Sequence, residues 1–291
     1  MDEIPLFDEL WDYAKPEETA ERLRILLPDG NGALEPSHHV QLLTQLARTY
    51  GLRQQFDQAH ALLDEAEGLL TADLSIARIR YLLERGRVLN SSRTADRGYT
   101  LFRGAWQLAQ AAGVDFYAID ALHMLGIAAE TVEEQLSWNL KALQLAELTL
   151  HERAQQWRGS LYNNIGWTYH DMGNYEQALT LFEKAEAYYA KAGSPRPWRI
   201  ARWTVAQVHR SLGHITEALA MQETLLAEAN ADDEAGYTLE ELAECLLALG
   251  KRAESRPYFG RAYAVLSQDQ WLAAYEPDRL QRLKELWQND S

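Results

Sequence analysis

The chain has 291 residues, of which 47% are hydrophobic, and its 43 acidic against 28 basic side chains give a formal net charge of −15. Such an acidic average field repels polyanions, and no basic stripe of the density used for nucleic-acid binding is present, so we expect no nucleic-acid partner. No stretch approaches the roughly eighteen apolar residues of a membrane span, the first residues lack the pattern of a signal peptide, and the lone Cys245 cannot form an internal disulfide, so the sequence predicts a cytoplasmic protein without membrane contact.

The first forty residues do not share the pattern of the rest. Proline followed by two glutamates at 16–18 is typical of a helix start, because proline is preorganised for the first turn and acids complement the helix dipole. Apolar residues at 23–27 continue this helix to Pro28, and the Asp-Gly-Asn-Gly run at 29–32 predicts a turn. A shorter helix is indicated before it by Leu6, Leu10, Trp11 and Tyr13. We interpret residues 1–36 as N-terminal capping helices, with a mobile lid as the alternative.

From residue 37 onward a single pattern of small residues recurs. The small residues, which are separated by 39, 40, 40, 40 and 37 positions, are Ala47, Gly86, Gly126, Gly166, Ala206 and Ala243. Nineteen positions after four of them stand the alanines Ala66, Ala105, Ala185 and Ala262, and Leu225 takes this place in the fifth repeat. Large apolar residues surround these positions with the three-and-four spacing of a helix face. The pattern predicts six hairpins of two antiparallel helices over residues 37–267.

The clearest copy covers residues 162–185. Its first apolar stripe ends at Gly173, which can adopt the left-handed conformation that ends a helix and turns the chain. A second stripe follows, and Gly166 and Ala178 mark where we expect the two helices to approach closely.

The third repeat departs from this spacing, because Ala142 follows Gly126 after only sixteen residues. Residues 131–134 match a capping box, which would start the second helix early. Sequence drift in the turn is one explanation. A local change of superhelix angle that shapes a pocket beside His123 and Trp138 is the other.

At the C-terminal end, Pro277 opens a helix that is apolar on one face and charged on the other. A stacked array needs such a half-polar element to cover its last apolar face. We interpret residues 268–291 as a C-terminal cap, with partner docking as the alternative.

The recurring hairpin resembles the tetratricopeptide repeat, a helical hairpin of about 34 residues with small residues at fixed points. The resemblance covers residues 40–265, and the copy around Gly166 matches best. The longer period places extra residues after the second helix, in stretches such as 191–199 and 230–236. Repeats of about forty residues are similar to those of bacterial sensor and regulator proteins and of some polarity scaffolds. The resemblance implies an all-α, right-handed superhelical solenoid that forms one continuous domain with capping helices at both ends.

In this family the inner surface of the superhelix, formed by the first helices, binds extended peptides. The positions that would face this groove change along the chain from basic to amide and aromatic, and then to acidic. They are Thr44, Arg48, Arg80, Leu83, Arg87, Asn90, His123, Ile127, Asn163, Trp167, His170, Trp203, Gln207, Arg210, Glu240 and Glu244. We take as the candidate peptide-binding residues Arg48, Arg80, Arg87, Asn90, His123, Asn163, Trp167, His170, Trp203, Gln207 and Arg210.

Guanidinium groups suit a carboxylate ligand, because they can bind it with two parallel hydrogen bonds. Arg48, Arg80 and Arg87 are therefore candidates to hold a carboxylate, Asn163 to bind peptide backbone, and Trp167 and Trp203 to pack apolar side chains. Some family members hold a C-terminal carboxylate with Lys, Arg and Asn, but the lysines of that set are missing here. The alternative is intramolecular: these arginines pair with acids of neighbouring helices.

The sequence offers no support for catalysis. It has no Gly-rich phosphate loop, no HExxH pair and no Gly-x-Ser-x-Gly turn, and it predicts no cofactor and no metal. His170, Asp171 and His209 could approach one another across neighbouring repeats, but burial of His209 in a packing position is the simpler account. We expect a non-catalytic adaptor that binds a protein or peptide segment in its groove. The alternative is a sensor module that changes its superhelix shape on binding a small peptide or ligand. The oligomeric state stays open.

Overall fold

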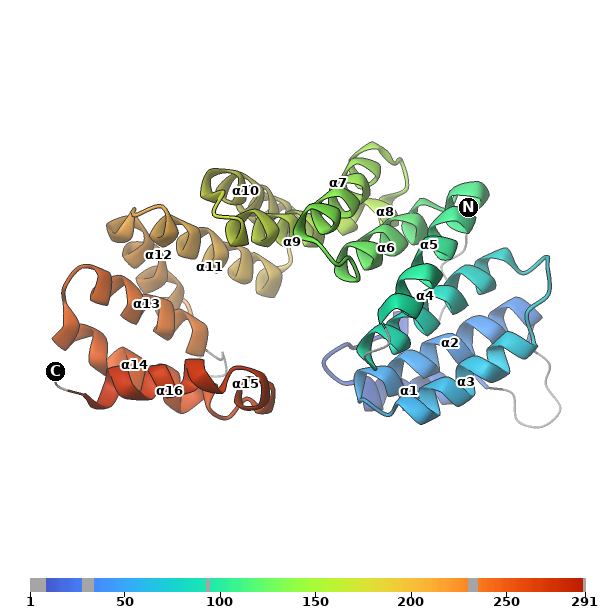
Figure 1. The fold of residues 1–291 in the computed structure, drawn as a ribbon, viewed down its shortest axis with the longest axis horizontal. Helices are drawn as coiled ribbons and strands as arrows, with labels where there is room; N and C mark the ends of the chain where they lie inside the picture. Colours follow the sequence, from blue (N-terminus) through green and yellow to red (C-terminus); the bar gives the residue numbers. More distant parts are fainter. Residues whose placement is uncertain (1–8, 28–33, 93–94, 230–234, 290–291) are drawn as a thin grey trace. The chain divides into compact units, whose positions relative to one another are not determined.

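The computed structural model describes residues 9–27, 34–92, 95–229 and 235–289, and the regular secondary structure within these ranges is helical throughout (Figure 1). Two compact units divide the chain at residue 161, Met1–Leu161 and Tyr162–Ser291. We describe each unit by itself. None of the described helices is both long enough and apolar enough to span a membrane.

In the first unit, consecutive helices pair as hairpins, α2 with α3, α4 with α5 and α6 with α7, and α1 packs on α2. The helices are α1 (Pro16–Arg24), α2 (Pro36–Leu52), α3 (Phe56–Gly68), α4 (Ser75–Ser91), α5 (Ala95–Ala112), α6 (Asp115–Ile127), α7 (Val132–Leu148) and the short α8 (Glu152–Gln155). The cores lie within and between the hairpins, where Phe102 of α5 packs with Ile79 of α4 and Leu125 of α6. Ala20 and Leu23 of α1 are buried with Leu42 and Leu46 of α2.

The second unit repeats this arrangement. Its helices are the larger part of α9 (Trp157–Asp171), which crosses the boundary, then α10 (Tyr175–Lys191), α11 (Pro195–Ser211), α12 (Ile215–Ala227), α13 (Gly236–Ala248), α14 (Arg252–Leu266), α15 (Gln270–Tyr275) and α16 (Pro277–Gln288). Proline opens α16 as predicted, and Leu280 and Leu283 are buried in the core that α16 shares with α13 and α14. Cys245 is buried, and its thiol is free.

The small residues of the repeat pattern are buried where a bulky side chain of the second helix reaches the first. A Cβ at Gly86 would lie 2.5 Å from the Phe102 ring, and a Cβ at Gly166 would lie 2.6 Å from the Phe182 ring. The close approach in the best-matching repeat is therefore between Gly166 and Phe182, four residues beyond the expected Ala178. Ala178 itself is fully buried.

In the third hairpin, a different side chain packs against the glycine of the first helix. Asn139 takes the place of the phenylalanine, and its amide would lie 2.7 Å from a Cβ at Gly126. Thr131 caps α7 by accepting a hydrogen bond from the Glu134 amide at 3.2 Å, which confirms the early helix start. A smaller side chain of the second helix thus accompanies the shortened spacing between Gly126 and Ala142.

The glycine turn predicted at Gly173 is confirmed, and it recurs at two further glycines of the second unit. Gly173, Gly213 and Gly250 have φ values of 77°, 84° and 74°, which lie in the left-handed region that glycine adopts without steric cost. Each of them follows the first helix of a hairpin.

Three details differ from the expectations. α1 ends at Arg24, before the expected end at Pro28, and Ile25 just beyond it is exposed. Trp11 and Tyr13, which were expected in a short helix, lie in a non-helical arm before α1. The extra residues of the long repeat are not all in loops, because α11 begins at Pro195, where proline is compatible with the first helical turn. Leu6, the turn at 29–32 and most of the stretch at 230–236 lie outside the described residues.

Candidate functional site

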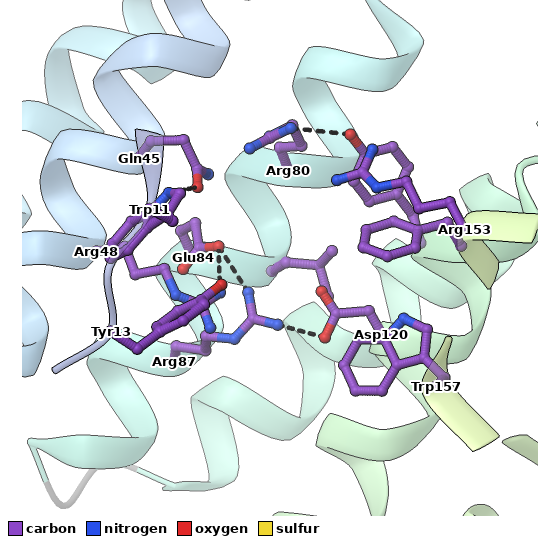
Figure 2. A pocket seen from close by; sticks show the side chains of 13 residues that line it. Trp11, Tyr13, Gln45, Arg48, Arg80, Glu84, Arg87, Asp120, Arg153 and Trp157 are labelled. Atoms are coloured by element: carbon purple, nitrogen blue, oxygen red, sulfur yellow. Dashed lines mark hydrogen bonds and ion pairs between the residues drawn. The ribbon is translucent and has the colours of Figure 1, made fainter. Parts of the chain in front are cut away.

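The inner faces of the first helices enclose a cavity of about 130 Å³ in the first unit. Its wall combines four arginines, two carboxylates and several aromatic rings (Figure 2). The lining residues are Trp11, Tyr13, Gln45, Arg48, Arg80, Leu83, Glu84, Arg87, Phe116, Tyr117, Asp120, Arg153 and Trp157. The arginines outnumber the carboxylates by two, so this wall is cationic in a chain whose net charge is −15. We call this cavity the central pocket.

Helical spacing brings these side chains together. Arg80, Leu83, Glu84 and Arg87 are separated by three, one and three residues, and therefore share one face of α4. The neighbouring first helices α2 and α6 supply the flanking walls. The arm before α1 and the segment from α8 to the start of α9 supply the remaining lining residues.

A shared ion network runs along the floor of the central pocket. Glu84 Oε1 accepts hydrogen bonds from Arg48 Nη1 at 3.0 Å and from Arg87 Nη1 at 2.6 Å, and Arg87 Nη2 donates to Asp120 Oδ1. The side chains of Glu84 and Asp120 are 5% and 8% exposed. Burial lowers the pKa of Arg87, but the two carboxylates outweigh this effect and hold it above its ordinary value. The network joins α2, α4 and α6 through charge-assisted hydrogen bonds.

This network decides between the two readings of the arginines. Arg48 and Arg87 contact acids of neighbouring helices, as the intramolecular alternative expected, and a guanidinium between two buried carboxylates has a structural role. Arg80 and Arg153 lie differently. Arg80 Nη1 donates to the Tyr117 hydroxyl at 2.9 Å, and the Arg153 guanidinium lies 3.8 Å from the centre of the Phe116 ring.

The arm before α1 forms one side of the central pocket. Trp11 and Tyr13 stack with ring centroids 4.9 Å apart, and the Arg48 guanidinium lies over both rings, 5.7 and 5.2 Å from their centres. Trp11 Nε1 donates to Gln45 Oε1 at 2.9 Å. These contacts attach the arm to α2 (Figure 2).

His123 and Asn90 belong to the first unit but do not line the central pocket. His123 Nδ1 lies 3.3 Å from Asn139 Oδ1, and its ring is 5.5 Å from the Trp157 ring of the pocket wall. Burial lowers the pKa of His123. Trp138, which was expected beside it, instead donates through Nε1 to the Tyr99 hydroxyl at 3.2 Å. Thr44 is fully buried and donates to the Gln41 carbonyl, so it lines no groove.

The remaining candidate residues lie in the second unit, where aromatic side chains come from successive first helices. Trp203 of α11 has its ring centroid 6.3 Å from Trp167 of α9 and 6.0 Å from Tyr237 of α13. We call these three rings the aromatic row. Trp203 Nε1 and Gln207 Oε1, one turn apart on α11, are buried without a hydrogen-bond partner among the described residues. Asn163 donates to Asn164 Oδ1 at 3.3 Å, and His170 Nε2 lies 2.9 Å from Ser211 Oγ.

Beside the aromatic row, arginines bind carboxylates in bidentate pairs, and Arg279 also donates to Glu276 at 2.9 Å. Arg210 of α11 donates to both oxygens of Glu241 at 2.7 and 2.9 Å. Arg279 and Arg282 of α16 contact Glu240 and Glu244 in the same two-pronged way. The acidic end of the predicted stripe is therefore matched by basic residues of α16.

Arg48, Arg80 and Arg87, three of the residues predicted to face the groove, line one cavity, but sequence reasoning missed much of the wall around them. Asp120 carried a readable signal, because it stands forty residues, one repeat, after Arg80. Glu84 was also detectable, since it shares the α4 face with Arg80 and Arg87. Trp11, Tyr13, Arg153 and Trp157 come from segments outside the repeat pattern, and their positions follow only from the tertiary fold.

The favoured account of His209, burial in a packing position, is wrong. His209 is only half-buried, and its Nδ1 lies 3.3 Å from Nδ1 of His214. Within the described ranges, no three His, Cys, Asp or Glu side chains are grouped in a way that could hold a metal ion.

Solved structures share this fold at low sequence identity. A signal-transduction ATPase from Pyrococcus horikoshii with a tetratricopeptide-repeat sensor is 16% identical over 92% of this chain, with a TM-score of 0.70, and this chain spans only 41% of that protein. RapI without ligand is 13% identical over 98% of this chain and 81% of its own, with a TM-score of 0.70. NprR in complex with its cognate peptide NprX is 14% identical over 98% and 84%, with a TM-score of 0.61.

Comparison with curated protein sequences finds no match. The tetratricopeptide-repeat family model matches residues 158–191, which comprise most of α9 and all of α10. This segment is the copy that the sequence pattern marked as clearest. The chain therefore has the fold of tetratricopeptide-repeat proteins, and residues 158–191 match the model of that repeat.

Proposed function

We propose that this chain is a non-catalytic binding module that holds a peptide or protein segment against the inner faces of its first helices, with an anionic group of that segment in the central pocket. The observation that carries this proposal is the cationic wall of the pocket, where four arginines and two carboxylates line a cavity of about 130 Å³. The four arginines exceed the two carboxylates of this lining, and Arg80 and Arg153 reach the wall beside Tyr117 and Phe116.

A carboxylate fits this surplus. Two planar guanidinium groups beside Phe116, Tyr117 and Trp157 offer charge-assisted hydrogen bonds next to apolar surface. The size of the cavity suits a side chain or a chain terminus.

The test uses a peptide library with free C-termini and the same library with amidated C-termini. Peptides that bind are then measured by fluorescence polarisation on wild type and on Arg153→Ala. We expect at least a tenfold loss of affinity in Arg153→Ala. Arg202→Ala is the matched control, because Arg202 also lies over an aromatic ring, 4.8 Å from Trp198, but belongs to the second unit. A peptide with equal affinity for wild type and Arg153→Ala would exclude the central pocket as its binding site.

The sensor reading is a second candidate, favoured by two of the similar structures, a tetratricopeptide-repeat sensor and NprR in complex with a peptide. It requires a small ligand that shifts the population of shapes. Thermal melting with cell-extract fractions above and below about 3 kDa separates the readings, because a ligand that binds only the folded state raises Tm. Stabilisation by the small fraction would support the sensor, and stabilisation by the large fraction alone would support the adaptor.

A further inference from the structure

A second constellation lies on the second helices of the first unit, away from the central pocket. The Lys141 ammonium of α7 lies over two indole rings, 4.9 Å from the Trp106 centre and 4.9 Å from the Trp138 centre. The two rings are 5.5 Å apart at an interplanar angle of 68°, so they form the two walls of a corner. The cation occupies that corner.

One wall of this corner is fixed by hydrogen bonds. Trp138 Nε1 donates to the Tyr99 hydroxyl at 3.2 Å, and that hydroxyl donates to Glu134 Oε1 at 3.1 Å. Glu134, Trp138 and Lys141 are spaced by four and three residues and therefore share one face of α7. The indole orientation thus does not depend on the cation. We call Tyr99, Trp106 and Trp138 the aromatic corner.

Lys141 itself is exposed, in a chain with 43 acidic side chains. Within the described part of the chain its ammonium forms no ion pair with a carboxylate, and its recorded contacts are the two rings. A long, exposed side chain can swing away from the corner at small cost. Lys141 therefore shows which chemistry the corner accepts, and it does not close the corner permanently.

We propose that the aromatic corner is a binding site for an alkylammonium group, namely a lysine side chain, methylated or not, of a partner protein, and that Lys141 is its replaceable internal occupant. Indole faces attract cations through their quadrupole, and two faces attract one cation more strongly than one. The net charge of −15 draws basic segments to the chain, and Glu134 adds a carboxylate beside the corner.

The internal occupant sets how tightly an external ligand binds. The tethered Lys141 competes with an external ammonium at an effective concentration in the millimolar range. The observed affinity for the external ligand is the intrinsic affinity multiplied by the fraction of molecules in which the corner is open. Removing the Lys141 charge therefore raises affinity for an external ammonium. We expect about a tenfold lower Kd in Lys141→Gln than in wild type.

The test follows the indole ¹H–¹⁵N signals of Trp106 and Trp138 during titration with choline chloride at constant ionic strength. The expected result is saturable shifts at both indoles, at about tenfold lower choline concentration in Lys141→Gln. The neutral carbon analogue 3,3-dimethylbutan-1-ol should cause no such shifts. Lys184→Gln is the matched control, because the Lys184 ammonium lies over a single ring, 5.7 Å from the Tyr162 centre. It should behave as wild type.

Three results would overturn the proposal. They are the absence of saturable choline shifts in Lys141→Gln, equal shifts with the neutral analogue, and equal choline affinities in wild type and Lys141→Gln. A further experiment tests the source of the ammonium group. It compares binding of an acetylated trimethyllysine amide with binding to phosphatidylcholine vesicles. Binding of the lysine derivative supports a protein partner. Binding to the vesicles without binding to the lysine derivative would reject it in favour of a lipid surface.

Discussion

The two units place arginines and carboxylates on their first helices in different ways. In the first unit, Arg87 contacts two carboxylates and Glu84 contacts two arginines, so the charges form one connected network beside a cavity. In the second unit, Arg210 binds Glu241 and Arg282 binds Glu244, each through a bidentate pair. Arg279 binds Glu240 in the same way and also donates to Glu276, so that none of these carboxylates is shared by two of these arginines.

The difference has a functional meaning. Under the proposed function, the aromatic row of the second unit packs apolar side chains of the ligand, as the sequence suggested for Trp167 and Trp203. The connected network balances the charges of its own four members and lies beside a cavity that Arg80 and Arg153 also line. An anionic ligand is therefore better matched to the first unit, and apolar side chains to the second.

The largest expected effect comes from breaking the network. Arg87→Met leaves Glu84 and Asp120 buried with less compensation, and removing one member of a buried ion cluster costs about 3–5 kcal/mol. We expect the free energy of opening of α4 and α6, measured by amide hydrogen exchange, to fall by about this amount. Adding Asp120→Asn should restore part of it.

Arg210→Met is the counterpart in the second unit. Its side chain is 28% exposed against 15% for Arg87, so water compensates Glu241 better and the loss should be smaller. An equal loss in both units would contradict the distinction between network and separate pairs.

The next largest effect concerns the tight helix contacts that both units share. Gly86→Ala and Gly166→Ala would each place a Cβ against a fully buried phenylalanine ring, and such overpacking costs about 1–3 kcal/mol. Chemical denaturation should show this loss for both variants. Gly104→Ala is the control, because its Cβ would meet only Leu82 at 3.7 Å, and helix propensity should then stabilise α5 by up to about 1 kcal/mol.

Mild acidification should move the two units in opposite directions. Burial lowers the pKa of His123 from 6.5, so the unfolded state binds more protons below that pH and the first unit loses stability as pH falls. Burial raises the pKa of Glu241 above 4.5, so the folded state binds the proton more tightly and the second unit gains stability as pH falls toward 4.5.

This contrast is measured by amide exchange of each unit at several pH values between 7 and 5. Each group changes the free energy of unfolding of its unit by at most about 1.4 kcal/mol per pH unit. His123→Gln and Glu241→Gln should each remove the pH dependence of their own unit only. A parallel response of both units in wild type would count against this assignment.

The smallest effects concern helix caps. Thr131 caps α7 and Asp269 caps α15 by accepting backbone hydrogen bonds at 3.2 and 2.8 Å, and replacing either by alanine should cost about 1 kcal/mol. Ser194 precedes α11 without a side-chain capping bond, so Ser194→Ala should be neutral. Helical circular dichroism during denaturation provides the measurement, and a cost for Ser194→Ala equal to that of Thr131→Ala would argue against the capping role.

Periodic features were readable from the sequence because they obey local rules. The recurrence of small residues every forty positions identified the buried contacts at Gly86 and Gly166, and helical spacing placed Arg80 and Arg87 on one face. Gly173, Pro277 and Thr131 marked helix ends through backbone chemistry that depends on neighbouring residues alone. The all-α class and the hairpin pattern follow from these rules.

Pairing across hairpins was decided by the tertiary structure alone. The sequence shows that Arg48, Arg87 and many acids are present, but which carboxylate meets which guanidinium depends on how far each helix slides against the next. The arm with Trp11 and Tyr13 and the segment with Arg153 and Trp157 have no repeat period, so no spacing rule could place them at the central pocket. Local sequence fixes the helices and their buried faces, whereas the wall of a site assembled from several helices depends on packing between residues far apart in the chain.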